Sequence, residues 1–275
     1  MKMTEQQHDD MNACMRSIDA DGRTRMLTWI GGSFAHGLVT GSSDLDMRTV
    51  MYATADTILL QHDEKPFHHP DYDLTLIPLQ CFLAQLLKGG MTALEALNLP
   101  DECMITHDCM ADDLTMHREM FLSKHLAHTC LKAAQSAIHH RFAYDAAQSA
   151  IHHRFAYDND ESMERMMLKA GKYYAEAFRL TWTARHIITD NVFLTRLTDG
   201  NELDYLRALR SGESMNACDG VIKASNGVSD RLSEEMRITE RICDESRLQA
   251  NLDASAYDYC NQLLHDANMR TIMNA

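Results

Sequence analysis

The sequence predicts an α+β fold, in which a small N-terminal domain with a mixed β-sheet precedes a mostly helical C-terminal domain. Strand-like runs occur only before residue 80, whereas helical patterns dominate after it. The 275 residues include only 12 Gly and 4 Pro, so few breakers interrupt the helices. A polar, Asp-rich stretch at 101–117 indicates a junction, and we expect domains at 1–105 and 106–275.

Three segments have the pattern of strands. The apolar run at 26–30 stops at Gly31-Gly32, as a buried strand does. In 45–49, Leu, Met and Thr alternate with Asp and Arg, and this period of two indicates a strand with one apolar and one polar face. The third candidate is 72–77, which follows a loop rich in His and Pro.

Helical patterns are continuous from residue 79 onward, and residues 1–20 form either an acidic lead-in or a first helix. Two short helices end at 89–90 and before Pro100. Further helices are expected at 118–158, 161–189, 202–211 and in two segments within 229–269. Turn-forming residues at 198–201 and 225–227 predict loops between them.

The charge balance limits the function. With 26 Lys and Arg against 40 Asp and Glu, the net charge is -14, which argues against a protein that coats nucleic acid or an anionic membrane with positive charge. A local basic groove remains compatible with this balance. Residues 161–210 hold eight Lys or Arg and seven acidic residues, and this neutral stretch permits an RNA-binding cleft.

The sequence predicts a cytoplasmic protein with no membrane association. No run approaches the roughly 18–20 apolar residues of a membrane span. The polar start MKMTEQQHDDMNAC lacks the apolar core of a signal peptide. Eight Cys are scattered without a CxxC pair, so we expect reduced thiols rather than disulfides or a structural zinc site.

One segment of the sequence is duplicated. Residues 133–145, AAQSAIHHRFAYD, recur letter for letter at 146–158, which indicates a recent tandem duplication, natural or engineered. Thirteen added residues would rotate an uninterrupted helix by about 220° beyond whole turns. We therefore expect either a longer connection between helices or a protruding helical end that carries one copy.

The stretch from Gly31 to Asp46 carries the most chemical information. Its glycines allow a close backbone approach, and the N–H groups of the turn together with the Ser33 hydroxyl can hold a phosphate. Asp44 and Asp46 on a strand would point to one face, roughly 6–7 Å apart at Cα. Two carboxylates so close repel each other unless a cation lies between them, and oxygen ligands suit Mg²⁺. The combination indicates metal-assisted phosphoryl transfer.

The same residues resemble a known family. GSFAHGL and SDLDMR are similar to the G-S-x-A-x-G-L and S-D-x-D-x-R motifs of the DNA polymerase β-like nucleotidyltransferase superfamily, in the RNA-repair-pathway DNA polymerase β-family branch of predicted nucleotidyltransferases. The resemblance continues through Asp73-Leu74-Thr75 and FLAQLLKGGMTALEALNLP, and more weakly through 121–124 and 172–180. It departs at 90–91, where Gly-Met replaces Asn-Pro, and at Glu176, where His is common.

The resemblance implies a palm-like catalytic domain and a role for each motif residue. It implies that Gly32 and Ser33 bind the β- and γ-phosphates of a nucleotide, and that Asp44 and Asp46 hold two Mg²⁺ ions. Asp73 completes the metal-binding and catalytic set, either as the base or as the group that orients the acceptor hydroxyl for attack on the α-phosphate.

Other charged residues near these motifs have alternative roles. Asp71 is the competitor of Asp73. Lys172 and Arg179, two turns apart on one helical face, either reach the triphosphate or belong to a solvated face. Arg48 pairs with a neighbouring Asp or contacts substrate, and packing is favoured over phosphate contact for His36. Adjacent histidines in the repeats do not face each other on a helix, which argues against a metal site there.

The expected function is transfer of a nucleoside monophosphate from a nucleoside triphosphate (NTP) to an acceptor hydroxyl, with Mg²⁺ and release of pyrophosphate. An RNA end, including that of tRNA, is the favoured acceptor. The main alternative is a protein hydroxyl, as in AMP-adding antitoxins of the same superfamily, and a small molecule such as an aminoglycoside is the third. An inactive nucleotide-binding interaction protein is a further alternative, although Ser33 and all three carboxylates are present.

Overall fold

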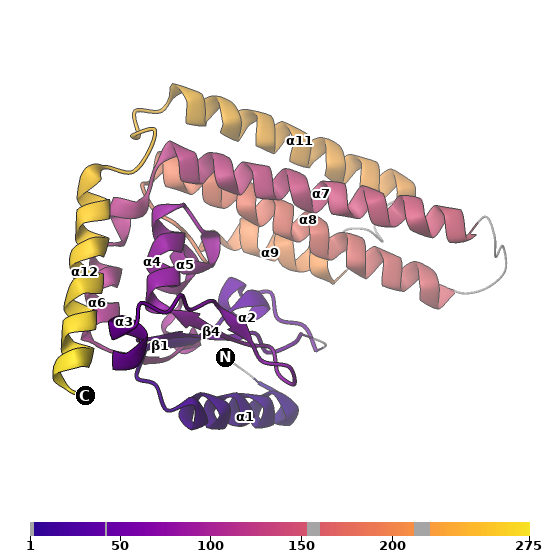
Figure 1. Ribbon diagram of the computed structural model, residues 1–275. Helices are drawn as coiled ribbons and strands as arrows, with labels where there is room; N and C mark the ends of the chain where they lie inside the picture. Colours follow the sequence, from indigo (N-terminus) through magenta and orange to yellow (C-terminus); the bar gives the residue numbers. More distant parts are fainter. Residues whose placement is uncertain (1–2, 42, 153–159, 212–220) are drawn as a thin grey trace. The chain divides into compact units, whose positions relative to one another are not determined.

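The computed structural model describes residues 3–41, 43–152, 160–211 and 221–275 (Figure 1). The chain divides into two compact units, Met1–Leu122 with Gln249–Ala275, and Ser123–Leu248. The C-terminal segment, assigned from sequence to the helical domain, thus belongs to the unit that contains the sheet. The domain boundary at 105/106 stays a prediction.

The first unit contains a five-stranded sheet in the order β3-β4-β2-β1-β5. The strands are β1 (Arg25–Ile30), β2 (Met47–Met51), β3 (Phe67–His68), β4 (Leu74–Pro78) and β5 (Met104–His107). β1 runs antiparallel to β2 and β5, β2 runs parallel to β4, and β3 runs antiparallel to β4. The expected α+β class with a mixed sheet is confirmed.

Three strands correspond to those expected, and two were missed. β2 begins at Met47, so Asp44 and Asp46 precede the strand rather than lie within it. The segment 101–117, interpreted as a junction, holds β5 and a helix in the structure. β3 and β5 have two and four residues, too few for an alternating pattern to stand out.

Helices surround the sheet of the first unit. They are α1 (Glu5–Asp21), α2 (Gly32–His36), α3 (Ala55–Leu59), α4 (Leu79–Leu87), α5 (Met91–Leu97), α6 (Cys109–Met116) and α12 (Ala254–Met273), with the 3-10 turns η1 (Asp101–Cys103) and η2 (Arg118–Phe121). Residues 1–20 were expected to form either an acidic lead-in or a first helix, and the structure has the helix α1. It begins with a capping box, in which the Gln7 N–H donates to Thr4 Oγ1 and the Thr4 N–H donates to Gln7 Oε1.

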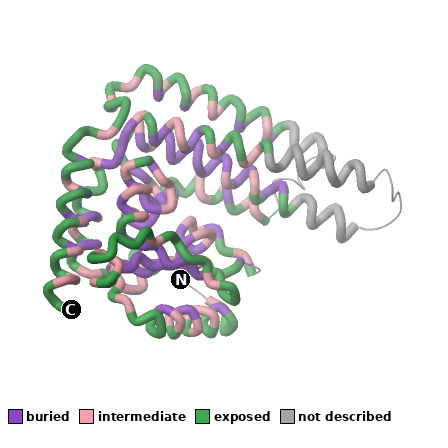
Figure 2. The backbone as a smooth tube through the Cα atoms, in the orientation of Figure 1, coloured by how far each residue is buried: buried purple, intermediate pink, exposed green. Residues whose placement is uncertain are grey.

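The two faces of the sheet pack against different helices. Cys14 and Ile18 of α1 belong to one buried cluster with Met47 of β2 and neighbouring strand residues. Successive strand residues point to opposite faces. Trp29 therefore points away from α1, and its ring meets that of Phe82 in α4 with centroids 6.4 Å apart. The strands β1, β2 and β4 are mostly buried, and the outer surfaces of the helices are exposed (Figure 2).

The second unit is a helical bundle centred on α8. Its helices are α7 (Lys124–His152), α8 (Asp160–Thr189), α9 (Gly200–Arg210) and α11 (Val221–Glu245). α8 packs against the other three (Figure 1), and its described residues from Tyr174 to Ala184 are buried almost all round. The loop expected at 225–227 was wrong, because these residues lie inside α11.

The duplicated segment begins inside α7. The helix continues through the first copy and into the second as far as His152, and the rest of the second copy lies outside the described residues. The loop expected at 198–201 is partly correct, because Asp199 caps α9 and the helix begins at Gly200. In the part of the chain that the structure describes, no helix is long and apolar enough to cross a membrane.

Candidate active site

Three strand ends meet at one end of the sheet and bring a part of the predicted site together. Ile30 of β1 is paired with Met47 of β2, which is paired with Leu74 of β4. One residue further out, the Gly31 N–H donates to the carbonyl of Asp46 at 2.8 Å. The Met47 N–H donates to the carbonyl of Asp73, also at 2.8 Å. Gly31, Asp46 and Asp73 therefore form a row across neighbouring strands, which we call the carboxylate edge.

The glycines after β1 give the Asp46 side chain its place. A Cβ on Gly31 would lie 3.4 Å from Asp46 Oδ2, and a Cβ on Gly32 would lie 3.2 Å from it. Gly32 also has φ of +55°, in the left-handed region that favours glycine. The sequence-based expectation that these glycines permit a close approach is thus met by the Asp46 carboxylate itself.

Asp46 sits in an unfavourable electrostatic environment. Burial raises the pKa of its carboxyl group, the neighbouring Arg48 opposes this, and the negative charges of Asp73 and Glu95 raise the pKa further. Arg48 donates from Nε to Oδ1 at 3.1 Å and from Nη2 to Oδ2 at 2.7 Å. Of the two roles considered for Arg48, the structure has pairing with Asp46.

The chemistry of these side chains suits a hard divalent cation. The negative charge of Asp73 contributes to the raised pKa of Asp46. A cation between the two carboxylates would relieve this repulsion. The Arg48 guanidinium supplies positive charge to Asp46 in this arrangement. Asp44 and Asp73 are exposed at the same strand ends. Within the described residues, no three Asp, Glu, His or Cys side chains are already grouped as a metal cage.

The turn that follows β1 is held in place from both sides. α2 starts at Gly32, and Ser33 in its first turn is half-buried. Its carbonyl accepts a hydrogen bond from the Leu38 N–H at 2.9 Å. Further along, Gln7 of α1 donates from Nε2 to the Ser43 carbonyl at 2.8 Å, in a buried contact. Gln7 thus anchors the segment that leads to Asp44, a role that no sequence signal indicated.

A second pair near the carboxylate edge was also missed. His36 Nε2 lies 3.1 Å from Glu95 Oε1, and both side chains are nearly buried. Packing was favoured for His36, and the structure adds a specific partner to it. The available signal was Glu95 itself, the single acidic residue in the otherwise apolar helix α5.

Lys172 and Arg179 lie in the second unit, whereas the other predicted site residues lie in the first. Lys172 is exposed on α8, but Arg179 is only 2% exposed. The Arg179 guanidinium donates from Nε and Nη2 to the two carboxylate oxygens of Glu176, at 3.0 and 2.7 Å. Glu176, a departure from the family pattern, is therefore the partner of a predicted nucleotide-binding residue.

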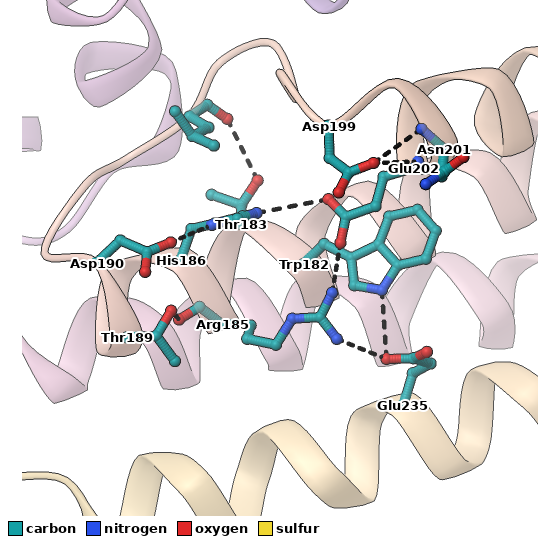
Figure 3. A network of polar contacts seen from close by, with 11 residues as sticks. Trp182, Thr183, Arg185, His186, Thr189, Asp190, Asp199, Asn201, Glu202 and Glu235 are labelled. Carbon is teal, nitrogen blue, oxygen red and sulfur yellow. Dashed lines mark hydrogen bonds and ion pairs between the residues drawn. The ribbon is translucent and has the colours of Figure 1, made fainter.

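The second unit also contains a network of ion pairs between its helices (Figure 3). Arg185 of α8 bonds to Glu202 of α9 and, at 2.9 Å, to Glu235 of α11. His186 lies 2.5 Å from Asp190 and 3.4 Å from Glu202. Hydrogen bonding to Glu202 raises the pKa of His186, burial opposes this, and Asp190 raises the pKa further. This network joins helices and has the form of a structural contact.

Comparisons with known proteins agree with the motifs. Residues 4–196 match the RNA repair pathway DNA polymerase beta family, a span that covers more than half of the chain and includes the whole carboxylate edge. A search of curated proteins gives no match. The family description indicates a polymerase β-like nucleotidyltransferase role in RNA repair. On this match, the chain belongs to the RNA repair pathway DNA polymerase beta family.

Proposed function

We propose that the protein is a Mg²⁺-dependent nucleotidyltransferase that moves a nucleoside monophosphate from an NTP to the terminal hydroxyl of an RNA. The observation that carries the proposal is the carboxylate edge, where a glycine turn and two carboxylates from separate strands lie in one row. The RNA acceptor rests on the family description. A protein hydroxyl is the second candidate, because the superfamily resemblance applies equally to enzymes that modify proteins.

In the proposed reaction, the acceptor oxygen attacks the α-phosphorus of the NTP. A new P–O bond forms, the bond from the α-phosphorus to the bridging oxygen breaks, and pyrophosphate leaves. Asp73, which is exposed at the end of the row, takes the proton of the acceptor hydroxyl or orients that hydroxyl. Asp71, which is also exposed, is the alternative for this role.

The remaining site residues bind and position the nucleotide. In this proposal Gly32 and Ser33 contact the β- and γ-phosphates. Asp44, Asp46 and Asp73 hold two Mg²⁺ ions, which supply charge stabilisation for the attacking and leaving oxygens when bound. Arg48 donates two hydrogen bonds to the Asp46 carboxylate, which orient it and oppose the rise in its pKa caused by burial.

The helical unit contributes two cations to the proposal. Lys172 is exposed on α8, and the proposal keeps it as a point charge for the phosphates of the nucleotide, as the resemblance implies. Arg179 is buried and donates two hydrogen bonds to the Glu176 carboxylate, so its contribution to nucleotide binding depends on that carboxylate. Both residues keep the nucleotide-binding role expected from the resemblance.

A labelling experiment distinguishes the acceptors. The protein is incubated with Mg²⁺, each α-³²P-labelled NTP in turn, and a mixture of short RNAs, and the products are separated by size. Label on RNA, with pyrophosphate release and loss of both in EDTA, is the expected result. Label on protein would favour the protein acceptor, and label on an added aminoglycoside would favour the small-molecule acceptor. If nothing is labelled although the protein still binds NTP, the protein is an inactive nucleotide-binding protein.

The same assay separates the two candidates for the base. Asp73→Asn is expected to abolish transfer, whereas Asp71→Asn, on the same turn, is expected to keep it. The opposite result would move the assignment to Asp71.

A further inference from the structure

The turn between β3 and β4 lies beside the carboxylate edge. Asp73 is the last residue of this turn, because β4 begins at Leu74. The His69 N–H donates to the Leu74 carbonyl at 2.9 Å and closes the turn at the same end of the sheet as Asp46. In the strand order β3-β4-β2-β1-β5, the glycine turn follows β1 and this turn precedes β4. The Asp46 carboxylate therefore lies between the two turns.

Three aromatic rings gather on this turn and on the strand β3 that leads into it, and we call this group the aromatic turn (Phe67, His69 and Tyr72). Phe67 and Tyr72 are 50% and 38% exposed, although large aromatic side chains usually bury most of their surface. The Phe67 and His69 rings meet edge to face with centroids 6.4 Å apart. The His69 and Tyr72 rings lie 5.0 Å apart at 32°. The rings thus contact one another, while Phe67 and Tyr72 stay partly exposed to solvent.

The aromatic turn is held in place by its own backbone. The Asp71 N–H donates to His69 Nδ1 at 3.2 Å, which fixes the orientation of the central ring. The neighbouring His68 is bonded to Thr75 of β4 at 3.0 Å. Rings that are already fixed lose little conformational freedom when a flat ligand stacks on them.

The charges around the aromatic turn select the kind of ligand. Asp71 and Asp73 are both exposed next to the rings, so a phosphate group placed there would be repelled. A nucleobase carries no charge, and aromatic side chains stack on the bases of unpaired RNA. The surface therefore suits a base rather than the phosphodiester backbone.

We propose that the aromatic turn stacks on the 3′-terminal base of a single-stranded RNA acceptor and so places its terminal hydroxyl next to Asp73. This inference rests on the proposed function, because it takes RNA as the acceptor and Asp73 as the group that meets its hydroxyl. Tyr72 directly precedes Asp73 in the chain, so a base held on Tyr72 brings its own ribose to the carboxylate edge.

The test uses a single-stranded RNA with 2-aminopurine, a fluorescent base, at its 3′ end. Stacking should quench its fluorescence on binding to the full-length protein. Phe67→Ala and Tyr72→Ala should each weaken RNA binding by about tenfold and reduce the quenching. Tyr72→Phe should keep both, because the ring remains. Binding of a nonhydrolysable NTP, measured by calorimetry, should not change in any of these variants.

Two controls make the result specific. Tyr257→Ala removes another exposed tyrosine of the same unit, on α12, and should have no effect. An RNA whose 3′-terminal nucleotide is abasic, with the ribose kept and the base removed, should bind the wild-type protein about tenfold more weakly. Tyr72→Ala should add no further loss of affinity for this RNA. Thermal melting checks that each variant folds as the wild type does.

The outcomes separate this inference from the proposed function. If wild type labels RNA but both alanine variants bind it as tightly as wild type, the aromatic turn is overturned and the proposed function stands. If wild type neither binds nor labels RNA, the RNA acceptor is wrong and the inference fails with it. Equal weakening of NTP binding in the alanine variants would place the incoming nucleotide on the turn and would also overturn the inference.

Discussion

The carboxylate edge and the ion network of the helical unit treat charge in opposite ways. At the edge, burial raises the pKa of Asp46, the paired Arg48 opposes this, and the charges of Asp73 and Glu95 raise the pKa further. In the network, Arg185 bonds to a carboxylate on each of two other helices (Figure 3). The edge thus keeps an excess of negative charge in a partly buried place, whereas the network pairs its charges across helices.

This difference indicates what each arrangement is for. A partly buried carboxylate with a raised pKa costs stability in its ionised form, and such groups cluster at functional sites. Pairs that connect three helices fix the helices to one another, although exposed pairs each contribute little. The first region thus has the charge of the proposed cation site, and the second has the form of a structural contact between helices.

The largest expected effect is the loss of transfer on removing charge from the edge. Asp46→Asn should lower transfer activity by about a hundredfold or more. In the proposed reaction the carboxylates hold the ions that stabilise the charged oxygens, so losing one carboxylate weakens that stabilisation. The unfolding free energy of the variant should stay equal or rise. Since the folded pKa of Asp46 is raised, ionisation costs stability as pH rises through it, and Asn removes that cost.

The matched control is Asp19→Asn, an exposed carboxylate that is also paired with an arginine, Arg25, at 2.7 Å. It should keep full activity. Transfer assays and urea unfolding at neutral pH measure both quantities. Activity of Asp46→Asn near the wild-type level would remove the carboxylate edge from the reaction, and the same experiment applies to Asp44→Asn.

The second prediction breaks the helical unit by packing rather than charge. A Cβ on Gly171 of α8 would lie 2.0 Å from the Leu209 carbonyl oxygen, so α9 would have to move. Gly171→Ala should lower the unfolding free energy by about 2–3 kcal/mol, as overpacking does. Gly227→Ala in α11 meets nothing within 4 Å and should instead stabilise by roughly 0.5–1 kcal/mol. Urea unfolding compares the pair, and equal effects would show that α8 and α9 are not in this close contact.

Much of this arrangement was predictable, because the informative patterns are local. The three longer strands have apolar or alternating runs, and a glycine turn followed by closely spaced carboxylates indicates phosphate and cation chemistry on residue types alone. The family motifs then assigned roles to the same positions. The row of Gly31, Asp46 and Asp73 follows from the register in which the strands pair. The sequence predicted the strands themselves but not their register.

The rest depends on contacts between distant parts of the chain. The Gln7–Ser43 bond spans 36 residues and the His36–Glu95 pair spans 59, so no local pattern contains them. The burial of Arg179 likewise depends on how the helices pack, because a cation at a helical position is usually solvated. Short strands and turn-type residues inside a long helix were missed since packing outweighs weak local preference there.

The third prediction compares two lysines of the helical unit. Lys172→Ala should weaken binding of a nonhydrolysable NTP by about tenfold, the loss of a charge-assisted phosphate contact. Lys169→Ala removes an exposed cation from the same helix and should bind as wild type does. Calorimetry measures both. Equal affinity for Lys172→Ala and wild type would assign Lys172 to the solvated face.

The smallest expected effect concerns pH and the ion network. His186 contacts Asp190, which directly follows α8, and Glu202 on α9. The neighbouring Arg185 also bonds to Glu202, and to Glu235 on α11. The pKa of His186 is raised above the model-peptide value of 6.5, chiefly by Glu202. The protonated ring therefore stabilises the fold below about pH 6.5, and this contribution is lost as pH rises through the raised pKa.

Because the pair is partly exposed and screened by water, its contribution should be only about 0.5–1 kcal/mol. His186→Gln should lower the unfolding free energy at pH 6 and have a smaller effect at pH 9, because the contribution of the charged ring falls as pH rises through its raised pKa. Urea unfolding at both pH values gives this difference directly. His265→Gln, which changes an exposed histidine of α12, serves as the control for removing a histidine. An equal loss at both pH values would mean that His186 acts through packing, and the network would then hold the bundle without using the charge of its histidine.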